Sequence, residues 1–346
     1  MSVRALQMCV RGVEKTRRYL SGRALILLYH RIAETDLDPW QLAVTPQHLE
    51  EHLQVLREYG SVIPLQKMAA AVERRRLPRR CVAVTFDDGY ADNLLTAKPL
   101  LEKYDVPATL FITTGYTGRD REFWWDELER LFLEPGELPG ALELKLNGNH
   151  KRWELGENAY YQEGSYQRNQ LWRAWQADEP TTRHSIYRSL WQLMLPMCEN
   201  DRLRLRDELL SWAGDSGSAR GTHRVLGREE IAELDRGGLI EVGCHTITHP
   251  QLSALGRKPQ LDEIRQSKLS LEEIVGHPVS GFAYPYGRDC DYTGETVGLV
   301  REAGFAYSCT TSVGVAERGV DRFQLPRVQV QDIDGESLGR LLSEWL

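Results

Sequence analysis

The sequence predicts an α/β fold, a β/α barrel that is interrupted by a large, mainly helical insertion. Short apolar segments of strand length alternate with segments that place apolar residues at helical spacing, and this alternation is typical of a mostly parallel sheet. Polar or reactive residues end four of the apolar segments, in ALILLYHR, CVAVTFDD, LIEVGCH and SGFAYPYG. Because the strands of a β/α barrel point their carboxyl ends at one mouth, we expect these residues to meet there.

The overall composition is that of a globular protein. The 346 residues are 41% hydrophobic and 27% charged, a balance typical of soluble chains, and they suffice for one barrel with additional elements. The net charge of -7 argues against a nucleic-acid partner. The six cysteines have no paired spacing and are expected to be reduced thiols: Cys9, Cys81, Cys198, Cys244, Cys290 and Cys309.

The first predicted unit is a basic amphipathic segment, residues 1–23. Between residues 3 and 20, apolar side chains recur at helical spacing among five basic ones, Arg4, Arg11, Lys15, Arg17 and Arg18. Two interpretations stay open, a helix packed on the body of the protein and a helix resting on an anionic membrane surface. The apolar run at 24–29 is too short for a signal-peptide core or a membrane span. We therefore expect a cytoplasmic protein, with peripheral contact at the inner membrane face as the alternative.

Two stretches, 24–119 and 226–346, carry the alternation of strands and helices that predicts the barrel. Helical patterns within them run through 45–60 and 261–276. The residues between the two stretches, 120–225, break this rhythm. They hold long charged helical patterns and seven of the nine tryptophans: Trp124, Trp125, Trp153, Trp172, Trp175, Trp191 and Trp212. We expect a helical insertion here, and most of its tryptophans should form its core.

Two adjacent carboxylates, Asp87 and Asp88, follow the apolar strand at 81–86 and precede Gly89. On its own, this pattern also fits a turn in which aspartate side chains bond the backbone. If both carboxylates are buried, however, their like charges need a shared proton or a cation. The pair therefore predicts either a catalytic dyad or a metal site.

Two histidines favour the metal site. His245 and His249 lie four residues apart, directly after another apolar strand and just before Pro250. Two imidazoles and one carboxylate make three protein ligands, a set that leaves one position open for water. Such ligands suit Zn²⁺ and, less selectively, Co²⁺, Ni²⁺ or Fe²⁺. We expect one divalent ion, and Zn²⁺ is the best match.

Three motifs occur in a fixed order, TFDDG at 85–89, HTITH at 245–249 and YPYG at 284–287. Together they resemble the motifs of the polysaccharide deacetylase family, carbohydrate esterase family four. The resemblance covers roughly residues 24–118 and 226–332 and leaves the insertion unmatched. It implies a distorted seven-stranded β/α barrel and a metal-dependent enzyme that removes N- or O-acetyl groups from glycans.

The resemblance also implies a role for each matching residue. Asp87 matches the general base of the family, while Asp88, His245 and His249 match its metal ligands. With this division, the charge of Asp88 is neutralised by the metal ion. Asp87 stays free to take a proton from water whose pKa the ion lowers.

The resemblance implies that the YPYG motif stabilises the oxyanion that forms during hydrolysis. In the family the donor is the backbone N–H after the proline, here that of Tyr286, while Pro285 fixes the turn and donates nothing. Two positions depart from the family pattern. Phe282 replaces an arginine that often holds the base, and Arg327 replaces a histidine that commonly acts as the acid. Arg327 cannot give up its proton, so we expect it at the site as a partner of Asp87 in place of the missing arginine.

His30 is the candidate for the missing acid. It ends the first barrel strand in LYHRI, as in family members whose acid comes from an early Tyr-His motif. The alternative is a core histidine whose ring is satisfied by a backbone carbonyl.

The expected function is metal-dependent hydrolysis of acetyl groups, chiefly N-acetyl, from a carbohydrate, a polysaccharide or a lipid-linked glycan. Trp124 and Trp125 lie close to a strand end, so they could line a cleft and stack on a sugar. Two alternatives stay open. One is a catalytically silent barrel that binds glycan or scaffolds polysaccharide assembly, and the other is a metal amidohydrolase acting on a non-sugar amide. The complete set of motif residues favours an enzyme over the silent barrel.

Overall fold

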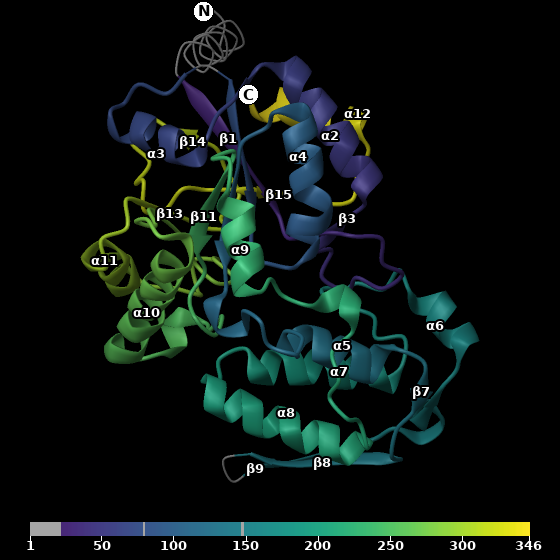
Figure 1. Cartoon of the computed structure of the whole chain (residues 1–346). Coiled ribbons are helices and arrows are strands. Elements are labelled where there is room, and N and C mark those ends of the chain that lie inside the picture. Colours follow the sequence, from purple (N-terminus) through teal and green to yellow (C-terminus); the bar gives the residue numbers. More distant parts are fainter. Residues whose placement is uncertain (1–21, 79, 147–148) are drawn as a thin grey trace, which may run out of the picture.

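The computed structural model describes residues 22–78, 80–146 and 149–346. Its centre is a curled sheet (Figure 1) with the strand order β13-β12-β11-β6-β5-β1-β14, in which β15 also pairs with β1 and β4 with β5. The strands are β1 (Arg23–Tyr29), β4 (Ser61–Val62), β5 (Cys81–Phe86), β6 (Ala108–Ile112), β11 (Ile240–Cys244), β12 (Gly281–Ala283), β13 (Tyr307–Cys309), β14 (Ala316–Glu317) and β15 (Val328–Gln329). These pairings are parallel except that of β1 with β14. The predicted α/β fold is confirmed.

The two ends of the sheet are linked through the segment that leads into β15. Val328 of β15 pairs with Leu27 of β1, and Leu325, just before β15, forms a parallel bridge with Cys309 of β13. The sheet therefore curls into a distorted barrel in which the chain around β15 joins the first strand to the other edge.

The apolar runs in the sequence correspond to the buried strands. All of β5 and nearly all of β1 are buried, as expected for parallel strands covered on both faces. Helices surround the sheet (Figure 1): α2 (Pro46–Tyr59), α3 (Leu65–Glu73), α4 (Lys98–Tyr104), α9 (Arg228–Asp235), α10 (Arg257–Val275), α11 (Gly294–Glu302) and α12 (Gly335–Trp345). The helix predicted at 45–60 is confirmed as α2, which Thr45 caps by accepting from the N–H of His48. The helix predicted at 261–276 begins earlier, at Arg257.

The chain between β6 and α9 forms a layer of its own beyond the carboxyl ends of β1 and β5 (Figure 1). Its elements are α5 (Trp124–Leu133), β7 (Gly136–Glu137), β8 (Ala141–Leu146), β9 (Asn149–Glu154), β10 (Tyr160–Tyr161), α6 (Glu163–Asn169), α7 (Thr182–Met194) and α8 (Glu199–Ala213). Buried residues of this layer, Trp124, Trp125 and Trp172 among them, form a core separate from those of the sheet. The layer is mainly helical, as predicted, but the antiparallel β8–β9 hairpin was not expected.

The basic amphipathic segment at 3–20 lies outside the described residues, so its membrane contact stays a prediction. Within the described ranges, no helix combines the length and the apolarity that crossing a bilayer requires. The described cysteines are free thiols: Cys81, Cys244 and Cys309 are buried, and Cys198 and Cys290 are exposed.

Candidate active site

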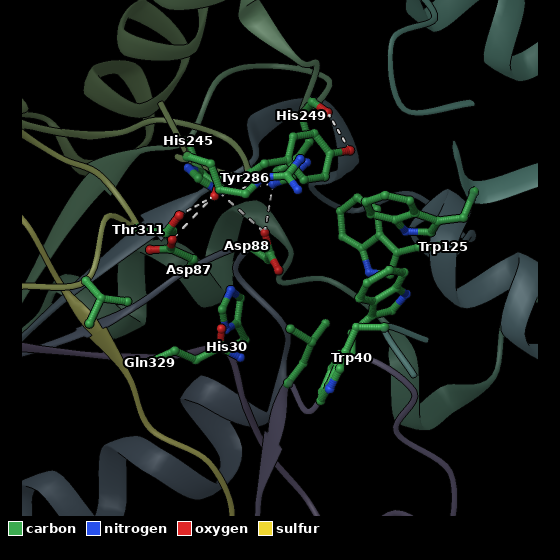
Figure 2. Close-up of a pocket in the computed structure, with 15 residues that line it drawn as sticks. His30, Trp40, Asp87, Asp88, Trp125, His245, His249, Tyr286, Thr311 and Gln329 are labelled. Carbon is green, nitrogen blue, oxygen red and sulfur yellow. Dashed lines mark hydrogen bonds and ion pairs between the residues drawn. The ribbon is translucent and has the colours of Figure 1, made fainter. Parts of the chain in front are cut away.

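A pocket of about 400 Å³ opens where the barrel meets the insertion (Figure 2). Its polar end is lined by residues that the sequence predicted for the site and that follow three of the strands: His30, Asp87, Asp88, His245 and His249. Its walls are aromatic and come from Trp40, Trp125, Trp175, Trp191 and Tyr286. The predicted meeting of strand ends at one mouth is therefore seen in the structure.

Three buried side chains bring one potential metal-ligand atom each to a common point. The Nε2 atoms of His245 and His249 are 3.2 Å apart, and they lie 3.6 Å and 3.4 Å from Oδ1 of Asp88. A tetrahedral ion with bonds of about 2.0–2.1 Å holds its ligand atoms about 3.4 Å apart. The Asp88 Oδ1 atom is buried and has no hydrogen-bond partner among the described residues. The residues present therefore fit a divalent ion.

The hydrogen bonding around His245 prepares this ring as a ligand. Its Nδ1 lies 2.8 Å from the carbonyl oxygen of Ala283. Because only a protonated nitrogen can donate to a carbonyl, Nδ1 carries the hydrogen. Burial lowers the pKa of His245, so the ring is neutral and Nε2 keeps its lone pair. The His249 ring packs against Trp125 and Tyr286, with centroids 4.8 Å and 4.6 Å away. Burial, and then the charge of Arg202, keep the pKa of His249 well below its usual value, so this ring is neutral as well.

Three residues of the site have left-handed backbone. Asp88, His249 and Tyr286 have φ values of 75°, 53° and 59°. Side chains other than glycine rarely adopt this conformation, and where they do, the surrounding structure must impose it. Such positions cluster at functional sites, and here they orient two potential metal ligands and the turn beside them.

Arg327 holds Asp87 through two hydrogen bonds. Its Nη1 donates to Asp87 Oδ1 at 2.7 Å and its Nη2 to Oδ2 at 2.6 Å, and both side chains are buried. Burial alone would raise the pKa of Asp87, but the charge and the hydrogen bonds of Arg327 lower it below its usual value. Asp88 has no such partner, so burial and the neighbouring Asp87 charge raise its pKa. The pairing of Arg327 with Asp87 expected from the sequence is present.

The His30 ring lies beneath Asp88 and faces the two carboxylates (Figure 2). Its Nδ1 is buried and has no hydrogen-bond partner in the described ranges, which speaks against a core histidine satisfied by a carbonyl. Burial lowers the pKa of His30 to about 4, although the charge of Asp87 raises it. The ring is therefore neutral at neutral pH.

The YPYG turn follows β12 and is held by Thr311. The Thr311 hydroxyl donates to the carbonyl of Tyr286 at 2.6 Å, and its N–H donates to the carbonyl of Gly287 at 2.9 Å. Gly287 has φ +68°, and a Cβ there would lie 2.7 Å from the Thr311 nitrogen, so a side chain at this position would break the contact. Pro285 shapes the turn from outside the pocket, whereas Tyr286 lines it.

The aromatic wall was largely missed by sequence reasoning. Trp125 lines the pocket, as predicted, but Trp124 is only 3% exposed and packs behind it without lining it. Trp40, Trp175 and Trp191 take part instead. The ring of Trp40 lies 4.3 Å from that of Trp191 and 6.5 Å from that of Trp175. No local motif marks them, because Trp40 precedes α2 and meets the other two only through the fold.

Comparison with known proteins places these features in a family. The family model described as polysaccharide deacetylase matches residues 74–138 and 211–308. The putative polysaccharide deacetylase YxkH of Bacillus subtilis is 29% identical over 108 residues, which are 31% of this chain and 37% of that protein. A poly-β-1,6-N-acetyl-D-glucosamine N-deacetylase of Staphylococcus aureus is 24% identical over 157 residues, 42% of this chain and 54% of that protein. The matches thus span about half or less of the length of these relatives.

Solved structures share the fold at low sequence identity. A deacetylase of Streptococcus pyogenes, PplD, solved in complex with acetate, has a TM-score of 0.57 and 18% identity, over 93% of this chain and 99% of that one. IcaB of Ammonifex degensii has a TM-score of 0.55 and 19% identity, over 93% and 97% of the two chains. The family model leaves out residues 139–210, which are most of the layer beyond the sheet, whereas both structural matches cover 93% of this chain.

Proposed function

Because the chain belongs to the polysaccharide deacetylase family, we propose that it is a metal-dependent hydrolase that removes N-acetyl groups from a carbohydrate. The observation that carries this proposal is the arrangement of Asp88, His245 and His249 beside the carboxylate of Asp87. The name of the Staphylococcus aureus relative specifies an N-acetylated polysaccharide, which supports the same class of substrate here.

The metal would be held by Asp88, His245 and His249. Their two nitrogens and one oxygen, spaced as the edges of a tetrahedron, favour Zn²⁺, and Co²⁺, Ni²⁺ or Fe²⁺ suit the same donors. When bound, the ion supplies Lewis-acid chemistry, which lowers the pKa of water and polarises a carbonyl.

Asp87 is proposed as the general base. Its carboxylate is ionised because Arg327 offsets the effect of burial on its pKa. Both of its oxygens accept hydrogen bonds from Arg327, so the carboxylate cannot rotate away from the pocket. In this position Asp87 takes a proton from the attacking water at a carboxylate oxygen.

The peptide N–H of Tyr286 is proposed as a donor to the oxyanion that forms when water attacks the acetyl carbon. It lies in the turn that Thr311 anchors, and it donates no backbone hydrogen bond to the residues described. A donor that is already fixed and unpaired stabilises developing negative charge without having to reorganise.

His30 is proposed as the group that hands a proton to the departing amine. Its ring lines the pocket and is neutral in the resting site, so it must gain a proton before it donates one. If this role is right, His30→Ala should slow hydrolysis of an acetamide far more than that of an activated aryl acetate, because an aryl oxide leaves without protonation. Equal losses on amide and ester would assign His30 to positioning instead.

The aromatic wall supports a carbohydrate over a simple amide. Flat rings of Trp40, Trp125 and Trp191 border the space in front of the carboxylates, and Trp175 stands 54% exposed at its rim. Amphipathic rings of this kind stack on the apolar faces of sugars while leaving sugar hydroxyls in water. A pocket of about 400 Å³ is of a size typical for small-ligand sites.

The test is acetate release after reconstitution with Zn²⁺ or Co²⁺. The substrates are N-acetylhexosamine oligomers, lipid-linked N-acetylated sugars and small acetamides without a sugar. We expect metal-dependent release from the sugars and little from the simple amides. Release from the simple amides alone would favour the non-sugar amidohydrolase. Glycan binding without any release by the metal-loaded protein would favour the catalytically silent barrel.

A further inference from the structure

The loop that carries both histidine ligands is held in an uncommon conformation. It runs from His245 to His249 after β11, and Thr246 and His249 have φ values of 64° and 53°. Left-handed backbone at residues other than glycine persists only where neighbouring groups fix it. The position of the His249 ring therefore depends on what holds the carbonyls and N–H groups of this loop.

The barrel holds the first part of the loop. Glu263 of α10 accepts hydrogen bonds from the N–H groups of Ile247 and Thr248 and from the Thr248 hydroxyl, at 2.7–2.9 Å. On the opposite side, the N–H of Gly115 donates to the carbonyl of Ile247 at 2.7 Å. These contacts end at Thr248. Beyond them, the barrel adds only a long hydrogen bond among the described residues, 3.5 Å from the Tyr286 hydroxyl to the carbonyl of His249. The carbonyls of Thr248 and His249 share a further partner.

That partner comes from the insertion. Arg202 of α8 is 1% exposed. Its Nη2 donates to the carbonyl of Thr248 at 2.9 Å and its Nη1 to the carbonyl of His249 at 3.2 Å. The guanidinium also lies 3.3 Å from Glu199, one turn earlier on the helix, and 5.9 Å from the ring of Trp124. The planar fork thus spans two successive carbonyls, which an ammonium group cannot match in geometry.

We propose that Arg202 is a positioning residue through which the helical insertion sets the metal affinity of the barrel. This inference rests on the proposed metal site. Arg202 touches no ligand side chain and acts on the backbone of His249. Without it, the carbonyl of Thr248 loses its donor, the carbonyl of His249 keeps only the 3.5 Å hydrogen bond from Tyr286, and the left-handed turn that aims the His249 ring loses a constraint. Outer contacts that orient a ligand typically change metal affinity by about 10–100-fold when they are removed.

The alternative is that Arg202 merely fastens the insertion to the barrel. The matched control is Arg206, on the same helix one turn later. Arg206 donates two hydrogen bonds of 2.7 Å to Glu127 within the insertion, and among the described residues it makes no hydrogen bond or ion pair with the histidine loop. Both arginines stabilise the layer. If Arg202 only fastens the insertion, the two substitutions should therefore affect metal binding alike, and a larger effect at Arg202 indicates a specific role.

The experiment measures Zn²⁺ and Co²⁺ affinity of chelator-stripped full-length protein by competition with a chromophoric chelator. We expect Arg202→Met to weaken binding at least about 10-fold, Arg202→Lys to weaken it less, and Arg206→Met to leave it within about twofold. The visible spectrum of the Co²⁺-loaded protein should change in the Arg202 variants and stay unchanged in Arg206→Met. The rise in Tm on adding Zn²⁺ should likewise shrink only in the Arg202 variants.

The outcomes separate this inference from the function it rests on. If the wild type binds Zn²⁺ and folded Arg202→Met binds it equally well, or if Arg206→Met weakens binding as much, the positioning role is wrong and the metal site stands. If Arg202→Met does not fold, wild-type affinity in Arg202→Lys overturns the inference. If the wild type binds no divalent ion, the proposed function fails and the inference fails with it.

Discussion

Two clusters of buried acidic side chains, one in the pocket and one in the insertion, differ in how their buried negative charge is compensated. In the insertion, Arg220 donates to both oxygens of Glu122 and to Glu129, and the hydroxyl of Tyr90 donates to Asp126. In the pocket, Arg327 satisfies only Asp87. Oδ1 of Asp88 has no donor among the described residues and faces two neutral imidazoles instead.

This difference in compensation distinguishes a structural cluster of carboxylates from a ligand-binding one. Buried carboxylates are tolerated when cations and hydrogen bonds of the protein compensate them, and the cluster around Arg220 meets this condition. A buried carboxylate that stays uncompensated next to two imidazole lone pairs is explained by a cation from outside the chain. Acidic residues alone do not mark a site, because the unsatisfied oxygen is the informative feature.

The largest expected effect separates the two carboxylates of the pocket. Asp87→Asn should lower the rate of acetate release about 10²–10⁴-fold, because it removes the proposed general base, yet it should keep most of the bound Zn²⁺. Asp88→Asn should lose both the metal and the activity. Metal analysis alongside kinetics checks this, and equal metal loss in the two variants would show that the roles are divided wrongly.

The second prediction concerns the compensated cluster. Arg220→Met leaves Glu122 and Glu129 without their shared cation, so the free energy of unfolding should fall by about 3–5 kcal/mol. Denaturant titration measures the loss. The control is Arg224→Met, because Arg224 pairs with Glu230 at the surface, and such a pair contributes at most about 1 kcal/mol. Similar losses in the two variants would show that the buried cluster around Arg220 stabilises the fold no more than a surface ion pair does.

The third prediction compares the effect of one substitution in each cluster on the free energy of unfolding of the metal-free protein. Asp88→Asn removes an uncompensated buried carboxylate and should raise the free energy of unfolding, whereas Glu122→Gln breaks satisfied hydrogen bonds and should lower it, each by about 1–3 kcal/mol. Adding Zn²⁺ should stabilise the wild type and leave Asp88→Asn nearly unchanged. The comparison breaks down if both substitutions destabilise the metal-free protein equally.

The smallest expected effect is on pH dependence. Burial raises the pKa of Asp126 to about 7 and that of Glu129 to about 8. The folded state then binds more protons than the unfolded state between the ordinary carboxyl range and these values, so stability falls as pH rises through that window. Buried His184 and His223 have lowered pKa values, about 4 and about 2, and act in the opposite direction below about pH 6.5.

The window for this measurement is pH 6.5–8, where the opposing effect of His184 and His223 fades as their unfolded forms lose their protons. Glu129→Gln should flatten the fall in stability there by at most about 1.4 kcal/mol per pH unit, the limit for one proton. Urea titrations of wild type and variant at several pH values give the difference. Parallel curves for the two proteins would show that Glu129 is not a source of the slope.

The sequence predicts those parts of the site that are local in the chain. Asp87, Asp88 and His245 come within two residues of the end of a buried strand, so strand direction alone brings them to one edge, and His249 lies four residues after His245. Arg202, Arg220 and Trp40 could not be found in this way, because their contacts join segments far apart in the chain. The β8–β9 hairpin was not predicted, although ALELKL alternates buried Leu142 and Leu144 with exposed residues as a strand does. The stretch is short and lies among longer charged segments with helical spacing, which favour a helical prediction for the whole region.

The closing of the barrel by β15 also bears on the order of assembly during synthesis. Asp87 and Asp88 lie in the first third of the chain, whereas the guanidinium that orients Asp87 arrives only with residue 327, beside a strand that must find β1 across almost the whole sequence. Contacts of such long separation form late, because the chain must first close a large loop. A nascent chain thus has the carboxylate proposed as its base long before it has the arginine that orients it, and the proposed hydrolytic activity should appear as one of the last events of folding.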